Sequence, residues 1–378
     1  MKNVVIAGYV RSPFTPAGKG ALARIRPDDI AAQVVAALVE RTGVKAADIE
    51  DLIVGCAFPE GEQGLNVGRL IGLLAGLPQS VAGMTVNRFC GSSMQSVHIA
   101  AGQIQLGAGE VFIAAGVESM SRVPMLGFNP LLNPALQAAV PDAYIGMGDT
   151  AENVARQWDI SRPNQEAFAV RSQQRAAAAA QAGRFDAELV AIKGHAGSVG
   201  SDGCIRADTS AAGLAQLKPS FAATGSVTAG TSSPLTDGAA ALLVCSEDYA
   251  ARNRLQPLAR IRSVAVAGCA PQIMGIGPVA ATRKALQRAH LEMADIDVVE
   301  LNEAFASQAL ACVRDLGIRD ETLNIDGGAI ALGHPLGATG ARIVGKAASL
   351  LRRLGGRYAL ATQCIGGGQG IATILERI

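Results

Sequence analysis

The chain has 378 residues, of which 49% are hydrophobic, and this supplies enough apolar material for a large core divided between more than one lobe. Its 33 lysine and arginine residues nearly balance 32 aspartate and glutamate residues, so the net charge of +1 creates no general field that would attract nucleic acid or an anionic membrane. Seven cysteines, an odd number with no pair at Cys-x-x-Cys spacing, support neither a disulfide framework nor a zinc ribbon.

The N-terminus, MKNVVIAGYVRSP, contains one short apolar stretch that ends at Arg11. That stretch is too short for the hydrophobic region of a secretion signal and much too short to span a bilayer. We therefore expect a cytoplasmic protein without membrane insertion and without a nucleic-acid partner.

The first strong pattern is an amphipathic helix over residues 28–41, followed by Gly43 and by a buried strand at 52–54. A similar pattern returns later: Ala-Asp-Ile begins at residues 47 and 294, which are 247 apart. The segments GEVFIAAGVES, from Gly109, and GRYALATQCIG, from Gly356, have the same offset of 247. One offset in two independent segments predicts an internal repeat. Short apolar strands alternating with helices predict two packed α/β halves with mostly parallel sheets.

Residues from about 119 to 230 have no counterpart in the second half. They combine loops containing Pro and Gly with one long helix, which begins near Ser161 and runs through Ala176 to Ala180. Insertions at the carboxyl ends of strands commonly cover the ligand crevice of an α/β sheet. We therefore predict an inserted lobe that forms a substrate-binding cap.

Cys90 lies in the turn between a strand at 84–86 and a helix whose apolar residues recur at spacings of three and four. The unpaired N–H groups and the positive dipole at a helix start stabilise a thiolate, so we expect Cys90 to have a lowered pKa and to be a good nucleophile. Nearby N–H groups can also donate to an oxyanion. The alternative is a structural cysteine that fills a small pocket, but the polar turn formed with Asn87, Gly91, Ser92 and Ser93 favours an exposed one.

Three further candidates lie at strand ends or turns. His334 stands between Gly333 and Pro335 before a helix, Cys364 ends an apolar strand before three glycines, and Asn302 follows the strand at 298–301. Each has a simpler explanation: a hydrogen bond within a turn, packing in the core, or a helix cap. Because Cys90, His334 and Cys364 fall on the same side of their sheets, we predict that they converge in one crevice.

With these residues identified, the chain resembles the thiolase family over essentially its whole length. The motifs that carry the resemblance are, in order, VRSPF, GVESMSRVPM, GDTAENVA, AGTSSPLTDGAA, NEAFA, GHPLGATGAR and CIGGGQG. The resemblance implies an α/β protein with the duplicated five-layer α/β/α/β/α thiolase fold. The N-terminal half would span 1–248, including the inserted loop lobe at about 119–230, and the C-terminal half would span 255–378.

The resemblance also implies the roles of the catalytic residues. Cys90 would be the nucleophile that becomes acylated, and His334 would activate it by taking its proton. Cys364 would be the general acid/base that protonates the departing acetyl-CoA carbanion and later deprotonates the incoming thiol. One oxyanion hole would combine His334 with a water held by Asn302, and the other would use the N–H groups of Cys90 and Gly366.

Coenzyme A is implied as a substrate, and we expect no permanently bound cofactor and no metal. Two methionines, Met147 and Met274, match residues that line the acyl pocket in family members, although filling the core is the alternative explanation for both. A local positive charge, rather than the net charge of the chain, would bind the nucleotide phosphates of coenzyme A. The residues that the resemblance assigns to coenzyme A are Arg206, Gly230, Ser233 and Leu235, with Ala304 and Phe305 beside the pantetheine.

Gly146 stands where members specific for acetoacetyl-CoA often carry a histidine, and SRVPM and CGSSMQ are more similar to the broader 3-ketoacyl-CoA thiolases. We therefore expect an acetyl-CoA C-acyltransferase that cleaves 3-ketoacyl-CoA with coenzyme A by a ping-pong acyl-cysteine mechanism. The alternative is a biosynthetic thiolase that condenses two acetyl-CoA molecules; a thioester hydrolase and an inactive acyl-CoA-binding scaffold are alternatives of other classes. The expected assembly is a homodimer or homotetramer, with a β-oxidation dehydrogenase or hydratase subunit as a candidate partner.

Overall fold

The computed structural model of the chain describes residues 2–195 and 197–378. In the N-terminal half, five strands lie in the order β4-β3-β5-β8-β1, and the short β2 pairs with β8. The strands are β1 (Val4–Arg11), β2 (Thr15–Pro16), β3 (Asp51–Gly55), β4 (Ala82–Val86), β5 (Val111–Ser119) and β8 (Thr236–Ser246). Their helices are α1 (Pro27–Thr42), α2 (Val67–Leu74) and α3 (Ser92–Leu106), so the helix predicted at 28–41 and the strands predicted at 52–54 and 84–86 are confirmed.

The C-terminal half repeats this plan after the linking helix α8 (Glu247–Arg252). Its strands lie in the order β10-β11-β12-β9, which matches β3-β5-β8-β1 of the first half. The strands are β9 (Ala259–Gly268), β10 (Val298–Leu301), β11 (Tyr358–Ile365) and β12 (Gln369–Glu376). The helices are α9 (Gly277–Ala289), α10 (Ala306–Leu316), α11 (Ala329–Leu332) and α12 (Leu336–Leu354).

The strand starts confirm the predicted repeat, because β10 begins 247 residues after β3 and β11 begins 247 residues after β5. The expectation of mostly parallel sheets is wrong. Strand β3 is parallel to β4 and β5, and β10 is parallel to β11, but β8 and β12 run antiparallel to both of their neighbours. The reason in the second half is local: β11 and β12 are joined by a tight glycine turn, and a short connection of this kind produces an antiparallel hairpin.

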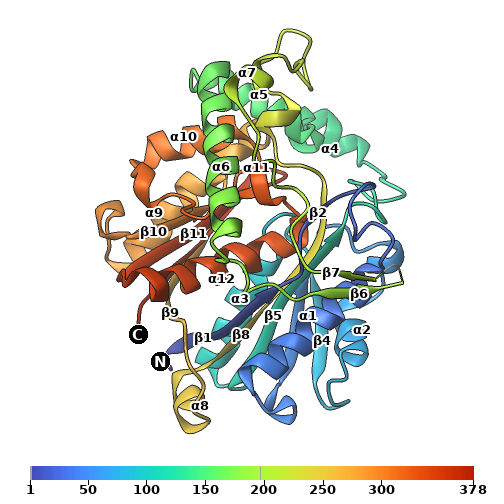
Figure 1. Ribbon diagram of the computed structural model, residues 1–378, viewed down its shortest axis with the longest axis vertical. Coiled ribbons are helices and arrows are strands. Elements are labelled where there is room, and N and C mark those ends of the chain that lie inside the picture. The colour runs from blue at the N-terminus through green and yellow to red at the C-terminus, as the bar shows by residue number, and fades with distance from the viewer. Residues whose placement is uncertain (1, 196) are drawn as a thin grey trace.

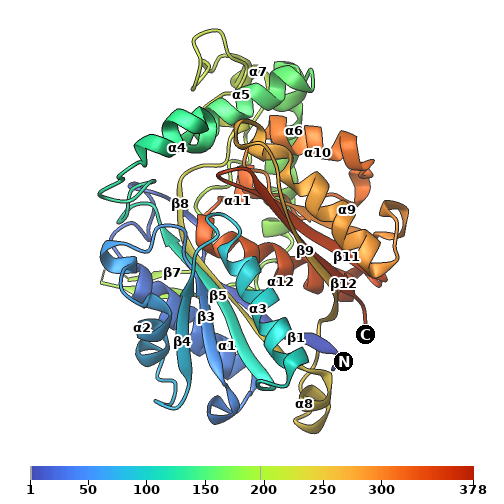
Figure 2. The same ribbon diagram turned by 180° about the vertical axis from the view of Figure 1, so that it is seen from behind.

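Five layers result, as the predicted fold class requires. Helices α3 and α12 lie between the two sets of strands, while α1 and α2 cover the outer face of the first set and α9 and α10 cover that of the second (Figures 1 and 2). The two sets join along one edge, where Val5 and Ile6 of β1 pair with β9. Because both faces of each set are covered, β1, β5, β8 and β11 are buried along their whole length. In the parts of the chain that the structure describes, no helix combines the length and apolar character needed to cross a membrane.

The helices of the segment between β5 and β8 form the group at the top of Figures 1 and 2, whereas its two short strands lie lower, beside α1. Its long helix α6 begins at Arg162, where the Ser161 side chain accepts a hydrogen bond from the Asn164 N–H group, and this confirms the helix predicted to start near Ser161. The elements of the segment are α4 (Pro134–Ala139), α5 (Met147–Gln157), α6 (Arg162–Gln181), β6 (Ile192–Gly194), β7 (Gly197–Val199) and α7 (Ala211–Ala215).

The N-terminal turns of α3 and α12 meet at the centre of the molecule. A Cβ atom at Gly340 of α12 would lie 2.3 Å from the backbone N of Met94 in α3, so only glycine permits this approach. The Ser93 hydroxyl accepts a hydrogen bond of 2.8 Å from the Ala341 N–H group across the same contact. Helices α3 and α12 occupy equivalent positions in the two halves of the repeat, and they are therefore in direct backbone contact at their N-terminal turns.

We predict that Gly340→Ala lowers the free energy of unfolding by about 1–3 kcal/mol, because the added methyl group must push two helix backbones apart. Denaturant unfolding followed by circular dichroism measures the change. The matched control is Gly102→Ala in α3, where a Cβ meets no atom within 4 Å. The control should gain roughly 0.5–1 kcal/mol from better helix propensity, and equal losses in both variants would contradict the close contact.

Candidate active site

Cys90 lies in a strained turn between β4 and α3. The Phe89 N–H group donates to Asn87 Oδ1 at 2.8 Å, and the Arg88 N–H group donates to Ser92 Oγ at 2.9 Å. Phe89 has a φ angle of +43°, a left-handed conformation that bulky residues rarely adopt. Such strain is maintained only when surrounding contacts impose it, and it gathers at functional sites. The turn leaves Cys90 half-buried, two residues before α3 begins.

Two backbone N–H groups converge on the Cys90 sulfur, namely those of Gly366 and of Cys90 itself. Burial nevertheless raises the pKa of the Cys90 thiol to about 11, because these donors only partly offset the loss of water around the thiolate. The expectation of a lowered pKa is therefore wrong. At rest Cys90 is a neutral thiol, so an attack by its sulfur would require a base, and the same two N–H groups could bind an oxygen that gains charge beside the sulfur.

The second thiol, Cys364, lies at the end of β11, one residue before the glycine turn to β12, and is only 1% exposed. Burial raises its pKa well above the ordinary value, and the neighbouring Cys90 adds to the effect. A Cβ at Gly366 would lie 3.4 Å from the Met147 sulfur, so the turn also approaches the start of α5. Cys364 therefore stays protonated at neutral pH and can donate a proton close to the Cys90 sulfur.

His334 is held in the loop before α12 by hydrogen bonds on both sides of the ring. Its Nδ1 atom lies 2.6 Å from Thr339 Oγ1, and its Nε2 atom lies 3.4 Å from the Asn302 side-chain amide. Its backbone N–H group donates to Thr236 Oγ1 at 3.0 Å. Burial, with a contribution from the Arg342 charge, lowers the pKa of His334 to about 3. The ring is therefore neutral at rest, with one ring nitrogen that carries no proton.

A buried carboxylate links the loop that follows β3 to the start of α12, the helix that follows His334. Glu118, at the end of β5, accepts hydrogen bonds from the backbone N–H groups of Ala57 (2.8 Å) and Phe58 (3.2 Å) in the first half. It also accepts one from Gly337 (2.9 Å) in the first turn of α12. Leu336, next to Gly337, packs in the same apolar cluster as Cys90. Glu118 thus fixes the start of α12 against the first half.

The residues assigned to the acyl pocket come together around Cys364. One apolar cluster contains Cys364 with Met274, Ala304 and Phe305, and Met147 packs against it. Both explanations for the methionines remain consistent with this placement, because the cluster is part of the core and also adjoins the catalytic candidates. The structure therefore brings five of the predicted residues into one contact group.

The residues assigned to coenzyme A are brought together only in part. Arg206 and Gly230 line one small cavity of about 40 Å³, and the Ser233 N–H group donates to the Ala304 carbonyl at 3.0 Å. Leu235 is exposed and follows Pro234, which lines the same cavity. Within residues 2–195 and 197–378, no three His, Cys, Asp or Glu side chains are grouped to hold a metal ion.

Sequence reasoning missed two functional positions, Thr339 and Glu118. Thr339 follows His334 by five residues inside GHPLGAT, and a hydroxyl one turn into a helix can reach back to a side chain in the preceding loop. Glu118 breaks an otherwise apolar strand, and a charged residue in such a run is itself a signal because buried charges need partners. Gly337 and Gly340, which follow in the same motif, lie inside α12, where they permit close packing.

Comparison with known proteins gives a consistent match along the chain. Residues 4–248 match the family "Thiolase, N-terminal domain", and residues 255–377 match "Thiolase, C-terminal domain". A protein of Bacillus subtilis (strain 168) named 3-ketoacyl-CoA thiolase is 46% identical over 389 aligned positions, covering all of both chains. Proteins with the same name are 48% identical in Yersinia pestis (strain Pestoides F), again over all of both chains, and in Marinomonas sp. (strain MWYL1), over all of this chain and 98% of the relative.

The protonation state of His334 can be tested directly, because the chain has only four histidines. With histidine labelled by ¹³C at Cε1, the NMR resonance of His334 should not shift between pH 5 and pH 8, since its pKa is lowered to about 3. Comparison with His334→Asn assigns the resonance. An imidazole of ordinary pKa, about 6.5, would pass through its midpoint in this range. A His334 shift with such a midpoint would contradict the buried, neutral ring.

Proposed function

The chain belongs to the thiolase family, and from that membership we propose that it cleaves 3-ketoacyl-CoA with coenzyme A to give acetyl-CoA and a shortened acyl-CoA. The observation that carries the proposal is the meeting of two thiols, Cys90 and Cys364, beside the Gly366 N–H group. One sulfur can attack a carbonyl while the other moves a proton, which is what acyl transfer between thioesters requires. The relatives named 3-ketoacyl-CoA thiolase support this substrate class.

In the first half-reaction, the Cys90 sulfur attacks the 3-keto carbon while His334 takes the thiol proton. The bond between C2 and C3 then breaks, the acyl group stays on Cys90, and the electron pair goes to C2 of the departing acetyl-CoA. Cys364 supplies the proton for that carbon and becomes a thiolate. Burial raises the pKa of both thiols, so each sulfur holds its proton at rest until a partner removes it.

In the second half-reaction, the Cys364 thiolate takes the proton of the coenzyme A thiol, whose sulfur attacks the acyl group. The bond to Cys90 breaks, and the Cys90 sulfur recovers its proton from His334. The N–H groups of Cys90 and Gly366 bind the oxyanion of the acyl carbon. Two fixed donors of this kind are each worth about 3–4 kcal/mol of transition-state stabilisation.

Asn302 serves the other oxyanion hole by orienting a water beside His334. Its Oδ1 atom is buried and accepts no hydrogen bond from the residues that the structure describes, which supports a role in holding a water. Its backbone is fixed by a hydrogen bond of 3.0 Å from its N–H group to the Thr362 carbonyl on β11. Asn302 therefore sits on a rigid element next to the strand that carries Cys364.

Coenzyme A acts in this proposal as a substrate, and no cofactor is bound permanently. The surface that receives it comprises Arg206, Gly230, Ser233 and Leu235, with Ala304 and Phe305 beside the pantetheine. Support comes from the contact between Ser233 and Ala304 and from the cavity that Arg206 and Gly230 share. The exposed guanidinium of Arg206 is the local charge for the nucleotide phosphates.

We further propose that the chain assembles as a homodimer or homotetramer in the cytoplasm. Strand β4 supports self-association, because it is an edge strand with partly exposed residues and lies next to the turn that carries Cys90. A β-oxidation dehydrogenase or hydratase subunit is the candidate for a further partner. Light scattering of the purified chain, alone and mixed with such a subunit, tests both parts.

We predict that mixing the protein with a 3-ketoacyl-CoA adds one acyl group, which mass spectrometry of a rapidly quenched digest locates on Cys90. Cys90→Ala should abolish the adduct. Cys364→Ala should retain slow acylation but lose about 10²–10⁴-fold in turnover, since it lacks the acid/base. Cys245→Ala, which removes a buried thiol of the N-terminal core, is the matched control and should behave as wild type. An adduct on any other residue would contradict the assignment of Cys90 as the nucleophile.

The alternative functions differ in whether they need coenzyme A and in which product they release. Omitting coenzyme A should stop turnover after one acyl group per chain, whereas a thioester hydrolase would continue and release free acid. An inactive scaffold would give no adduct at all.

Comparing kcat/KM for acetoacetyl-CoA with that for a longer 3-ketoacyl-CoA separates the biosynthetic enzyme from the broader one. We expect the longer substrate to be cleaved at least as well, and activity confined to acetoacetyl-CoA would favour the biosynthetic alternative.

A further inference from the structure

A cavity of about 470 Å³ lies away from the catalytic candidates, at the end of the molecule where α1 and α12 finish. None of the residues assigned above to catalysis or to coenzyme A lines it. Its walls come from the last turns of α1 and α12, the segment 184–188 that follows α6, the segment 254–258 that precedes β9, and β1. Elements of both halves of the repeat therefore build it.

The lining of this cavity is strongly positive, although the whole chain carries a net charge of only +1. A single acidic residue, Glu188, lines it. Glu188 does not leave a free negative charge, because it accepts ion pairs from Arg11 at 2.8 Å and from Lys346 at 3.1 Å. The cationic residues of the lining are Arg41, Arg184, Arg254, Lys346, Arg352 and Arg353.

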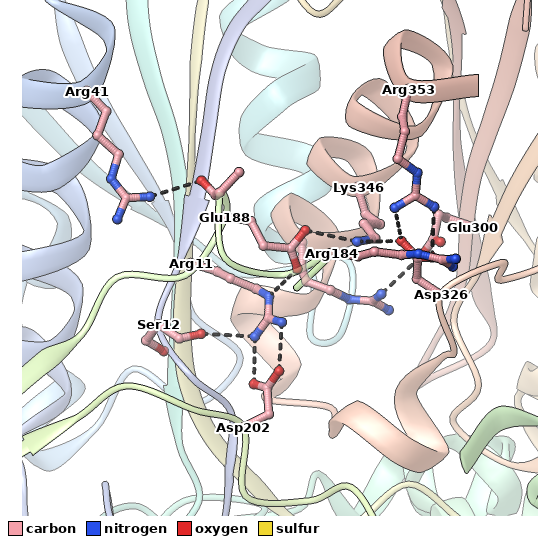
Figure 3. A network of polar contacts seen from close by, with 12 residues as sticks. Arg11, Ser12, Arg41, Arg184, Glu188, Asp202, Glu300, Asp326, Lys346 and Arg353 are labelled. Carbon is pink, nitrogen blue, oxygen red and sulfur yellow. Dashed lines mark hydrogen bonds and ion pairs between the residues drawn. The ribbon is translucent and has the colours of Figure 1, made fainter. Parts of the chain in front are cut away.

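Three of these cations already form ion pairs with one buried carboxylate behind the lining of the cavity. Asp326 accepts hydrogen bonds from both terminal nitrogens of Arg353, at 2.7 and 2.8 Å, and ion pairs from Lys346 at 2.9 Å and Arg184 at 3.2 Å. Figure 3 shows this network, in which the guanidinium groups of Arg41 and Arg353 lie to the two sides of Glu188. The network fixes the wall before any ligand arrives, and preorganisation lowers the cost of binding.

The other three cations, Arg41, Arg254 and Arg352, form no ion pair with any residue of 2–195 or 197–378. Arg41 donates instead to the backbone carbonyls of Ala187 at 3.0 Å and Leu189 at 2.6 Å. The helix dipoles offset part of the positive charge of these three arginines, because α1 and α12 both end here and each C-terminus carries roughly half a negative charge. Of the three positive charges of Arg41, Arg254 and Arg352, about two therefore remain uncompensated in this cavity.

We propose that this cavity binds a small phosphorylated molecule with an apolar body. Guanidinium groups offer paired N–H donors that fit phosphate oxygens. Beside them, Leu38, Leu255, Leu258 and Leu350 give the cavity an apolar wall, and its volume falls in the range of about 300–1,000 Å³ typical of small-molecule sites. Tyr9 also lines it, and its buried hydroxyl has no hydrogen-bond partner among the described residues.

Titration of the purified full chain with inorganic pyrophosphate by isothermal calorimetry tests the proposal. The wild type should bind, and Arg254→Gln combined with Arg352→Gln should weaken binding by about tenfold or more, because two charge-assisted contacts are lost. The matched control is Arg24→Gln combined with Arg262→Gln. Both of these arginines are exposed, neither forms an ion pair with a described residue, and the pair removes the same net charge elsewhere on the surface. The control should change the dissociation constant less than twofold.

A second titration in saturating coenzyme A identifies the source of the phosphate. Pyrophosphate that still binds, and still depends on Arg254 and Arg352, indicates an occupant other than coenzyme A. Pyrophosphate that coenzyme A displaces, with the same dependence, indicates that a coenzyme A nucleotide occupies this cavity. Absence of binding, equal weakening in both double variants, or displacement that ignores Arg254 and Arg352 would overturn the proposal. These results do not depend on whether the chain cleaves 3-ketoacyl-CoA.

Discussion

The active site depends on one contact, the meeting of the N-terminal turns of α3 and α12. A glycine makes this contact possible, because a Cβ at Gly340 of α12 would lie 2.3 Å from the Met94 nitrogen of α3. Gly116 of β5 and Gly55 of β3 let the two helix starts approach the strands, since a Cβ there would lie 2.1 Å from the Gly337 carbonyl and 2.3 Å from the Ser93 nitrogen. Cys90 precedes one of these helices by two residues, and His334 precedes the other by two. Because α3 and α12 occupy equivalent positions of the internal repeat, the duplicated architecture itself places Cys90 and His334 just before the starts of two helices that are in contact. Glu118 fixes the arrangement by binding backbone N–H groups from both halves.

Burial sets the proton states at this site, and the sign of its effect matters for the chemistry. It raises the pKa of both thiols and lowers that of His334, so the resting site holds neutral groups rather than a thiolate–imidazolium pair. A neutral site avoids the cost of a buried ion pair before substrate arrives. In the proposed reaction, charge appears only after substrate binds, next to the N–H groups of Cys90 and Gly366 that would receive it.

Periodicity was sufficient to predict the repeat and the helix starts around Cys90 and Ser161, because these follow from local patterns. The five-layer fold class was implied by the resemblance of the ordered motifs to the thiolase family. The mixed direction of the strands was not predicted, since β8 enters only after a long segment whose path is set by tertiary packing. The pKa of Cys90 was predicted with the wrong sign, because the helix start is visible in sequence while the desolvation of a sulfur is not. The buried network around Glu188 and Asp326 likewise joins residues more than 130 positions apart, which no local pattern reveals.

We expect the contact between α3 and α12 to place the Cys90 sulfur within reach of His334. A crystal structure of the unliganded protein tests this expectation through the distance from Cys90 Sγ to His334 Nε2. The separation should allow a hydrogen bond, at about 3–4 Å, or a bridge by a single water, at about 5–6 Å. A larger separation with both helices in place would mean that another group activates the thiol, and the proposed mechanism would be contradicted.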